Sequence, residues 1–376
     1  MKQAKKAIEG NPPSEEGSGK TPAPAALPHA RSSPRATGSA TVADVASIAG
    51  VSAMTVSRVL NNPERVSPRT LAVVKGAIER TGYVPNLLAG GLASRRSRLV
   101  AVVVPTIANS MFAQVTQALT DELGKAGYQV MLGLSGYDAS REQELLDAIL
   151  SRRPDGIVLT GTVHTDTTRT RLLKSGIPLV ETWDMSPSPM DMLVGFSHEQ
   201  VGVAVAEYLL DKGYRRFGLV FANDQRGDVR RRGLLAALAR HGISDVPLES
   251  VPVPSTMGLG KRHFAKLLER APGLDVVVCS SDPLAQGAIV EAQERGIGVP
   301  DQLAVMGFGD YDFAAELSPT LSSVSIDGKA IGNRAARFLV ARIEKTESAG
   351  SETVVDVGFS IIERRSTSKS KSKGSI

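Results

Sequence analysis

The residues best suited to recognition chemistry lie in one short stretch near the N-terminal end of the chain. Residues 52–61, SAMTVSRVLN, carry hydroxyl and amide side chains and one arginine at helical spacing. The guanidinium of Arg58 suits two parallel hydrogen bonds to a guanine edge, which discriminate between bases by about 1–3 kcal/mol. Ala53 and Met54 are apolar and suit thymine methyl groups and groove shape. The stretch therefore indicates a helix that reads the DNA major groove.

A helix that reads DNA bases must be held in place by its neighbours, and the flanking sequence predicts the helix, turn and apolar contacts that do this. Residues 44–49 form the expected first helix, Gly50 takes the turn, and Ser52 caps a second helix expected over residues 52–60. The apolar contacts of this pair are expected from Val45, Ala46, Ile48, Val51 and Val56. The pattern predicts a helix-turn-helix, although an ordinary helical pair has the same spacing.

The next stretch separates these two interpretations. A third amphipathic helix is expected at residues 68–81, and GYVPN and LLAGGLASRRSR follow it. With these motifs the chain resembles the lactose-repressor family of bacterial transcription regulators. The matching segments are VADVASIAGVS, TVSRVLN, the Val66-Ser67 pair, GYVPN, and Ala89, Leu92 and Ala93. The resemblance continues to about Arg364 and leaves out only the two tails.

The resemblance implies that some of these residues contact DNA bases and others contact phosphates. Ala53 and Met54 stand at the family's principal specificity positions, and Arg58 joins them in contacting bases. In the family a leucine, here Leu92, wedges into the minor groove. Polar residues are better assigned to phosphates, which fix the register without reading sequence: Ser52, Thr55, Ser57, Asn61, Ser67, Thr70, Tyr83 and Asn86.

Residues 86–97 are expected to be a hinge between residues 41–85 and the rest of the chain. Gly90 and Gly91 each cost about 1 kcal/mol in a helix interior. The segment is also shorter than the roughly 12–15 residues that an isolated helix needs. We therefore expect it to be disordered until DNA and a partner helix stabilise it, as the family resemblance implies. A plain flexible linker is the alternative.

Composition sets the ends of the chain apart from its body. The chain has 376 residues and a net charge of +5, and its basic residues crowd the first hundred positions and the last ten. This uneven charge suits a nucleic-acid partner at one end. Residues 1–40 and 365–376 are rich in small polar residues and lysine, which predicts a disordered basic extension and a disordered tail.

Several classes of protein are disfavoured. The single cysteine, Cys279, excludes an internal disulfide and is expected to be buried at a strand end. Five scattered histidines predict no metal site, and no cofactor motif is found. There is no apolar run of about 18 residues and no secretory signal, so we expect a cytoplasmic, nucleoid-associated protein without a membrane partner. The missing nucleophile elbow and P-loop argue against an enzyme. The N-terminal helices argue against a transport-associated sugar-binding protein.

From Leu99 onward, apolar runs alternate with helical segments such as residues 112–126, 141–151 and 200–212. This order predicts parallel sheets covered on both faces. The expected fold is an all-α helix-turn-helix headpiece followed by an α/β effector domain, residues 98–364, that is like periplasmic binding proteins. The resemblance implies two doubly wound subdomains with a ligand between them. Their expected bounds are 98–197 plus 326–345 for the first, and 198–325 plus 346–364 for the second.

Polar and aromatic residues follow several of the predicted strands. In open α/β sheets ligands bind beyond the carboxyl ends of strands, so these residues predict a cleft. Each one also fits a helix cap, and Asp282 before Pro283 is the best example. The expected effector-binding residues are Thr106, Asn109, Phe112, Asp184, Phe196, Arg226, Arg230, Ser281, Asp282 and Asp310.

The resemblance assigns roles to part of this set. Arg230 matches a ligand-binding arginine, Phe112 and Phe196 match lining positions, and the Ser281-Asp282 pair matches a hydroxyl-binding pair. Two departures count against a neutral galactoside. They are Ser255 where some members have an aromatic ring, and Gly309 where others have an acid.

Within the family, the resemblance is closest to the gluconate-utilisation repressors. The shared segments are GYDASREQE, PDGIVLTGTVHT, DMLVGFSH and GFGDYDFA. A sugar acid also suits a cationic pocket, because arginine donates forked bonds to carboxylate or phosphate. Arg226 and Arg230 are the candidates, unless one of them pairs with Asp224 or Asp228. Gluconate and 6-phosphogluconate are the expected effectors, with a neutral sugar or a nucleoside as the alternative.

The resemblance implies a homodimeric repressor on a palindromic double-stranded operator. Dimer contacts are expected from helices such as residues 112–126 and 284–295. We expect the effector to lower operator affinity. The sequence itself does not distinguish an inducer from a corepressor, because both act through the same cleft.

Overall fold

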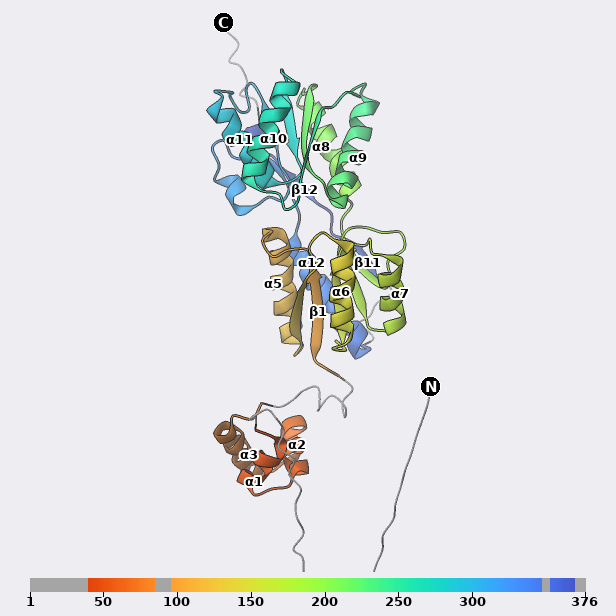
Figure 1. Ribbon diagram of the computed structural model, residues 1–376, viewed down its shortest axis with the longest axis vertical. Coiled ribbons are helices and arrows are strands. Elements are labelled where there is room, and N and C mark those ends of the chain that lie inside the picture. Colours follow the sequence, from red (N-terminus) through yellow and green to blue (C-terminus); the bar gives the residue numbers. More distant parts are fainter. Residues whose placement is uncertain (1–39, 85–95, 347–351, 369–376) are drawn as a thin grey trace, which may run out of the picture. The chain divides into compact units, whose positions relative to one another are not determined.

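The computed structural model describes residues 40–84, 96–346 and 352–368 (Figure 1). The chain divides into two compact units, residues 1–86 and 87–376. The expected N-terminal extension up to residue 39, most of the hinge, and Asn86 and Leu92 lie outside the described residues.

The described part of the first unit, residues 40–84, consists of three α-helices and a short 3-10 helix. These are α1 (Val42–Ala49), α2 (Ala53–Asn61), η1 (Pro63–Arg65) and α3 (Pro68–Thr81). A small apolar core of Val45, Val56, Val74 and Ala77 joins the three helices. No single helix of the described residues is long and apolar enough to cross a membrane, and α1 and α2 reach that length only as a pair bent by 104°. That bend lies in the range of helix-turn-helix motifs.

Local side-chain bonds set the helix ends of this unit. Thr41 and Asp44 form a reciprocal capping box at α1, and Ser52 caps α2 by accepting a hydrogen bond from the Thr55 amide. Gly50 ends α1 in the left-handed region at φ 62°, as the turn requires. The apolar contact predicted for Ile48 was wrong, because its side chain is 49% exposed. The buried face of α1 consists of Val45, Ala46 and Ala49 instead.

The second unit contains two parallel sheets. The first has the strand order β11-β5-β4-β3-β1-β2. Its strands are β1 (Leu99–Val104), β2 (Gln129–Leu134), β3 (Gly156–Thr160), β4 (Leu179–Trp183), β5 (Met192–Gly195) and β11 (Val354–Asp356). The helices that cover it are α5 (Ser110–Lys125), α6 (Ala139–Leu150), α7 (Asp166–Ser175) and α12 (Gly328–Glu344). Alternate residues of β1 enter opposite cores, Val100 and Val102 on the α5 face and Ala101 and Val103 on the α6 face. We call this sheet and its helices the first subdomain.

The second sheet has the order β7-β6-β8-β9. Its strands are β6 (Phe217–Ala222), β7 (Leu248–Val251), β8 (Val276–Cys279) and β9 (Ala304–Met306). Its helices are α8 (His198–Asp211), α9 (Gln225–Arg240), α10 (Met257–Arg270) and α11 (Asp282–Glu294). Helices α10 and α11 cover one face, and α8 and α9 cover the other (Figure 1). This is the second subdomain. Cys279 is buried at the end of β8, as expected.

The C-terminal segment corrects the expected boundaries. Residues 346–364 were expected in the second subdomain, but β11 pairs in parallel with β5 of the first sheet. The chain then crosses over, and β12 (Ser360–Ile362) pairs antiparallel with β10 (Ser323–Ser325).

The expected disordered tail also begins too early. Arg365–Thr367 forms the 3-10 helix η3, in which Ser366 and Thr367 are fully buried. The Ser366 hydroxyl donates to the Val305 carbonyl at 2.6 Å and accepts from the Ser322 amide at 2.8 Å. These bonds tie the end of the chain to β9 and to the residues before β10.

The left-handed turn at Gly50 predicts a large effect of adding one methyl group. Gly50→Ala should destabilise the first unit by about 1–2 kcal/mol, because a Cβ is unfavourable at positive φ. Gly76→Ala is the matched control. Gly76 lies inside α3 with open space around it, so alanine should stabilise the unit by up to about 1 kcal/mol. Hydrogen exchange of the α1–α3 amides in the full chain measures both, and equal protection in the two variants would contradict this account of the turn.

Candidate functional site

The exposed face of α2 presents the residues predicted to read DNA. Ala53, Met54 and Arg58 are exposed, and the Met54 side chain is 71% accessible. No ion pair joins Arg58 to a carboxylate in the parts of the chain that are described. The polar residues around them partly satisfy one another. The Ser52 and Thr55 hydroxyls are 2.9 Å apart, as are those of Ser67 and Thr70.

Asn61 and Tyr83 complete the described polar set. The Asn61 amide donates to the Ser57 carbonyl at 2.9 Å and approaches its hydroxyl at 3.2 Å. Tyr83 is half-buried and packs against the core of the first unit. The hydroxyl and amide side chains of this set are therefore engaged in intramolecular bonds.

A cavity of about 270 Å³ lies between the two subdomains of the second unit. Six of the predicted effector residues line it: Thr106, Asn109, Phe112, Arg226, Arg230 and Ser281. Residues that were not predicted also line it, including Tyr137, Trp183, His198, Thr256, Phe308 and Tyr311. The walls thus combine aromatic rings with a few polar groups, which is typical of small-molecule sites.

Two glycines bring the main cationic group of this cavity into position. A Cβ on Gly202 of α8 would lie 2.0 Å from the Arg230 carbonyl, and one on Gly233 of α9 would lie 2.2 Å from the Glu199 carbonyl. Only glycine permits so close a crossing of α8 and α9. The crossing places His198, at the start of α8, beside Arg230 on α9.

Arg230 is a buried cation with neutral partners. Its Nη1 lies 2.9 Å from His198 Nδ1, and its Nη2 donates to the Ser280 carbonyl at 3.1 Å. The guanidinium also lies 4.0 Å from the centre of the Phe308 ring. Burial lowers the pKa of Arg230 to about 10, which leaves it charged at neutral pH. Among the described residues, no salt bridge joins Arg230 to a carboxylate.

Arg226 is held differently, by an ion pair across the two subdomains. Its Nε donates to Asp184 Oδ1 at 2.9 Å. Burial opposes ionisation of Asp184, but Arg226 and His198 outweigh it and hold the pKa of Asp184 well below its usual range. The partners considered from the sequence are engaged elsewhere. Asp224 caps α9 through the Gly227 amide, and Asp228 pairs with Arg231.

Unsatisfied polar atoms collect around this cavity. Trp183 Nε1, Arg230 Nε and Ser281 Oγ are buried and have no hydrogen-bond partner among the described residues. Trp183 also adopts a φ of 79°, which is unusual for a bulky residue and typical of functional sites. Buried polar groups are nearly always paired in folded proteins. These atoms are therefore suited to bind a polar ligand.

Four predicted effector residues do not line the cavity. Asp184 lines two neighbouring pockets together with Arg226, and it also contacts His198. Phe196 is fully buried, with its ring centre 4.4 Å from that of His198, so it supports the wall from behind. Asp282 and Asp310 belong to a separate network under the cavity.

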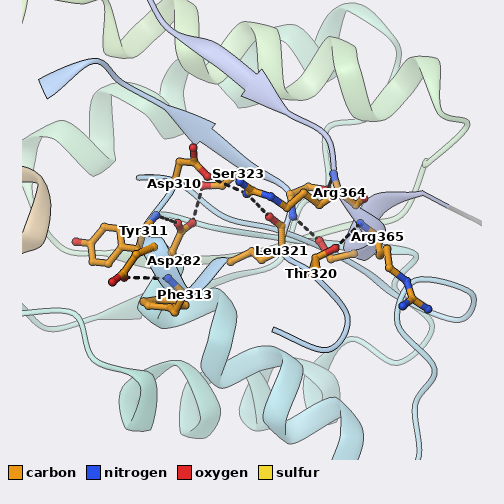
Figure 2. A network of polar contacts seen from close by, with 12 residues as sticks. Asp282, Asp310, Tyr311, Phe313, Thr320, Leu321, Ser323, Arg364 and Arg365 are labelled. Atoms are coloured by element: carbon orange, nitrogen blue, oxygen red, sulfur yellow. Dashed lines mark hydrogen bonds and ion pairs between the residues drawn. The ribbon is translucent and has the colours of Figure 1, made fainter. Parts of the chain in front are cut away.

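Figure 2 shows this network, which joins three elements: helix α11, the loop that follows β9, and strand β10. Asp282 accepts from the Ser323 hydroxyl at 2.6 Å and from the Tyr311 amide at 2.8 Å. Asp310 forms an ion pair with Arg364 at 2.8 Å. The predicted cap at Asp282 was also wrong, because Ser281 is the N-cap residue and Asp282 is the first helical residue. Its carboxyl group is engaged by the loop instead.

The network positions one of the aromatic residues that the sequence did not indicate. The Tyr311 hydroxyl donates to Asn109 Oδ1 at 2.7 Å, which bridges the second subdomain to the start of α5 in the first. Asn109 also accepts from the Met111 amide as the cap of α5. The only signal in the sequence was the aromatic cluster in GFGDYDFA.

Comparison with known proteins identifies the family. Residues 41–86 match the family of bacterial regulatory proteins, lacI family, and residues 206–367 match the periplasmic binding protein-like domain. The transcriptional regulator GntR of Pseudomonas aeruginosa is 39% identical over 335 residues, which cover 89% of this chain and 97% of the relative. The chain belongs to the lacI family. It is a DNA-binding transcriptional regulator, and its relatives are named as regulators rather than enzymes.

Solved structures agree with the fold. A lacI-family regulator from Silicibacter pomeroyi is 34% identical with a TM-score of 0.83, and the alignment covers 88% of this chain and all of that one. The lac repressor dimer bound to operator and an anti-inducer is 22% identical with a TM-score of 0.76, over 88% and 99% of the two chains. The predicted fold class and family are confirmed.

The buried carboxyl group of Asp282 predicts a specific pH dependence. Burial raises the pKa of Asp282 from 3.8 to about 6, so its contribution to stability is complete at low pH and is lost as the pH rises through that value. Asp282→Asn cannot ionise. Relative to wild type, its free energy of unfolding should therefore rise by up to roughly 3 kcal/mol between about pH 4 and pH 7.5. Urea denaturation at each pH measures this, and a constant difference would contradict it.

Proposed function

We propose that this protein is a homodimeric repressor whose operator affinity falls when a sugar acid occupies the cavity between its subdomains. Gluconate and 6-phosphogluconate are the proposed effectors. In this proposal Ala53, Met54 and Arg58 read bases, and the surrounding hydroxyl and amide side chains of the first unit hold phosphates. Two copies of the reading helix match a palindromic site.

Arg230 carries the case for an acid effector. A buried guanidinium whose direct contacts are all neutral is costly, since its charge has left water and Asp224 and Asp184 offset it only from a distance. A carboxylate or phosphate in the cavity supplies that charge and forms two parallel bonds. A neutral sugar leaves the cost in place. The resemblance to gluconate-utilisation repressors and the similarity to the GntR regulator of Pseudomonas aeruginosa support the same choice.

Coupling to DNA follows from contacts that cross the cavity. The Asp184–Arg226 pair and the Tyr311–Asn109 bond join the subdomains directly. A ligand that competes for Arg226 or contacts Asn109 changes these bonds and so the relative position of the subdomains. Such coupling typically amounts to 1–3 kcal/mol. A gel shift with rising gluconate should show weaker operator binding, and stronger binding would reverse the sign.

Arg230 variants test the effector. Arg230→Gln should weaken gluconate binding on the order of hundredfold, because the ligand loses its cationic partner. Arg230→Lys should be intermediate, since lysine keeps the charge but not the fork. Arg231→Gln is the control on the same helix, because Arg231 pairs with Asp228 and does not line the cavity. Calorimetry with gluconate and 6-phosphogluconate measures all of these. Wild-type affinity in Arg230→Gln, or no heat in wild type with either acid, would refute the proposal.

Arg58 tests the DNA interface. Arg58→Ala should weaken binding to an operator selected from random duplexes by about 5- to 150-fold, equivalent to about 1–3 kcal/mol. Its affinity for unrelated DNA should change much less. Arg80→Ala, at the far end of α3, is the charge-matched control and should affect both DNAs equally. Fluorescence anisotropy at fixed salt gives the ratio, and equal losses on both DNAs for Arg58→Ala would exclude base reading by this residue.

A further inference from the structure

His198 lies between two charged groups at the cavity, the carboxylate of Asp184 and the guanidinium of Arg230. Its imidazole is buried, with the Phe196 ring centre at 4.4 Å and that of Phe308 at 6.2 Å. Nδ1 lies 2.9 Å from Arg230 Nη1, and Nε2 lies 3.0 Å from Asp184 Oδ1. The ring therefore lies between a carboxylate of the first subdomain and a guanidinium of the second, and its hydrogen bond is with the guanidinium.

Arg230 determines which ring nitrogen carries the proton. A guanidinium nitrogen donates hydrogen bonds and accepts none, so Nδ1 must be the acceptor. The neutral ring then carries its proton on Nε2, which faces Asp184. Burial lowers the pKa of His198 to about 4; Asp184 opposes this shift, while Arg230 and Arg226 reinforce it. The ring is neutral at pH 7.

The geometry points to His198 as a positioning residue that selects an acidic effector by holding Arg230 through an uncharged acceptor. This inference rests on the proposed function, because it concerns how Arg230 meets its ligand. A carboxylate beside Arg230 would neutralise the guanidinium and compete with an acid ligand. An imidazole nitrogen fixes the same group and leaves its charge available.

The two other contacts of Arg230 do not fix its guanidinium without His198. Phe308 lies against the face of the guanidinium, and the Ser280 carbonyl accepts from Nη2. His198 holds Nη1, so the three contacts together fix the plane and the rotation of the group. Nε has no partner among the described residues, and it and the N–H groups of Nη1 and Nη2 that these contacts leave unused are the donors that remain for the ligand.

An isosteric pair of variants tests the role of charge. Asparagine at position 198 offers an uncharged acceptor near Nδ1, and aspartate offers a charged one of the same size. His198→Asn should bind gluconate within about threefold of wild type, while His198→Asp should bind on the order of hundredfold more weakly. A purely structural role predicts equal effects of the two variants. Equal gluconate affinities by calorimetry would overturn the inference.

The dependence of gluconate binding on acid pH gives a second test of the role of His198. The groups facing His198 are Asp184, Arg226 and Arg230, and protonation of the ring would place a cation against Arg230 and remove its acceptor. Wild-type affinity for gluconate should therefore fall below about pH 5 more steeply than that of His198→Asn, in which only the protonation of the ligand's own carboxylate weakens binding. The same pH profile in both proteins would contradict the role of the ring.

A ligand-independent measurement separates this inference from the proposed function. Nitrogen-15 spectra of the full chain labelled at histidine, assigned with His198→Asn, should show a proton on Nε2 and none on Nδ1 at pH 7. A proton on Nδ1 would overturn the inference whatever the ligand. If the spectra agree but wild type binds neither acid, the proposed effector fails while the assigned tautomer stands.

Discussion

The organisation of the effector cavity depends on one buried cation that forms no ion pair with a carboxylate of the described residues. Arg230 is 7% exposed, yet its partners are an imidazole nitrogen, a backbone carbonyl and an aromatic face. Carboxylates are near, but they are engaged elsewhere: Asp184 with Arg226, Asp224 with the start of α9, and Asp282 with β10 and the Tyr311 amide. The guanidinium of Arg230 therefore has no direct carboxylate contact among the described residues, and this is the basis of the proposed fit to an acid.

The fold provides this arrangement by close packing. Gly202 and Gly233 let α8 and α9 approach so closely that backbone of one helix meets backbone of the other at Arg230 and Glu199. The carboxyl ends of β4 and β6 then place Asp184 and α9 close enough for the ion pair between Asp184 and Arg226. Because several bonds cross between the subdomains, a ligand that alters them acts on the whole second unit.

Local signals allowed much of the fold to be predicted. The third helix was expected over residues 68–81 and is found at Pro68–Thr81, since Ser67 and Gly82 define both ends. The helices expected at 112–126 and 141–151 begin two residues earlier, at Ser110 and Ala139, because Asn109 and Asp138 act as caps. Edge strands carry weaker signals. The short strands β7 and β10 were missed, and the run VVDVGFSII was not divided between the two sheets, because periodicity does not show a crossover.

The candidate site was predictable only in part, for a physical reason. Residues at strand ends are identifiable in sequence, and six of ten line the cavity. Whether such a residue faces the cavity or supports it depends on partners distant in the chain. Asp282 is turned away by Ser323 and Tyr311, and Asp310 by Arg364. No role was predicted for His198, and its position beside Arg230 follows only from the crossing of α8 with α9.

The central claim is that the cavity holds an unmatched positive charge for an acid ligand. The most direct test compares gluconate with glucitol, which has the same hydroxyl chain and a neutral group in place of the carboxylate. Calorimetry on the wild-type protein should show gluconate binding at least about hundredfold more tightly. Equal affinities for the two compounds would show that the charge of Arg230 does not select the ligand, and would contradict the account.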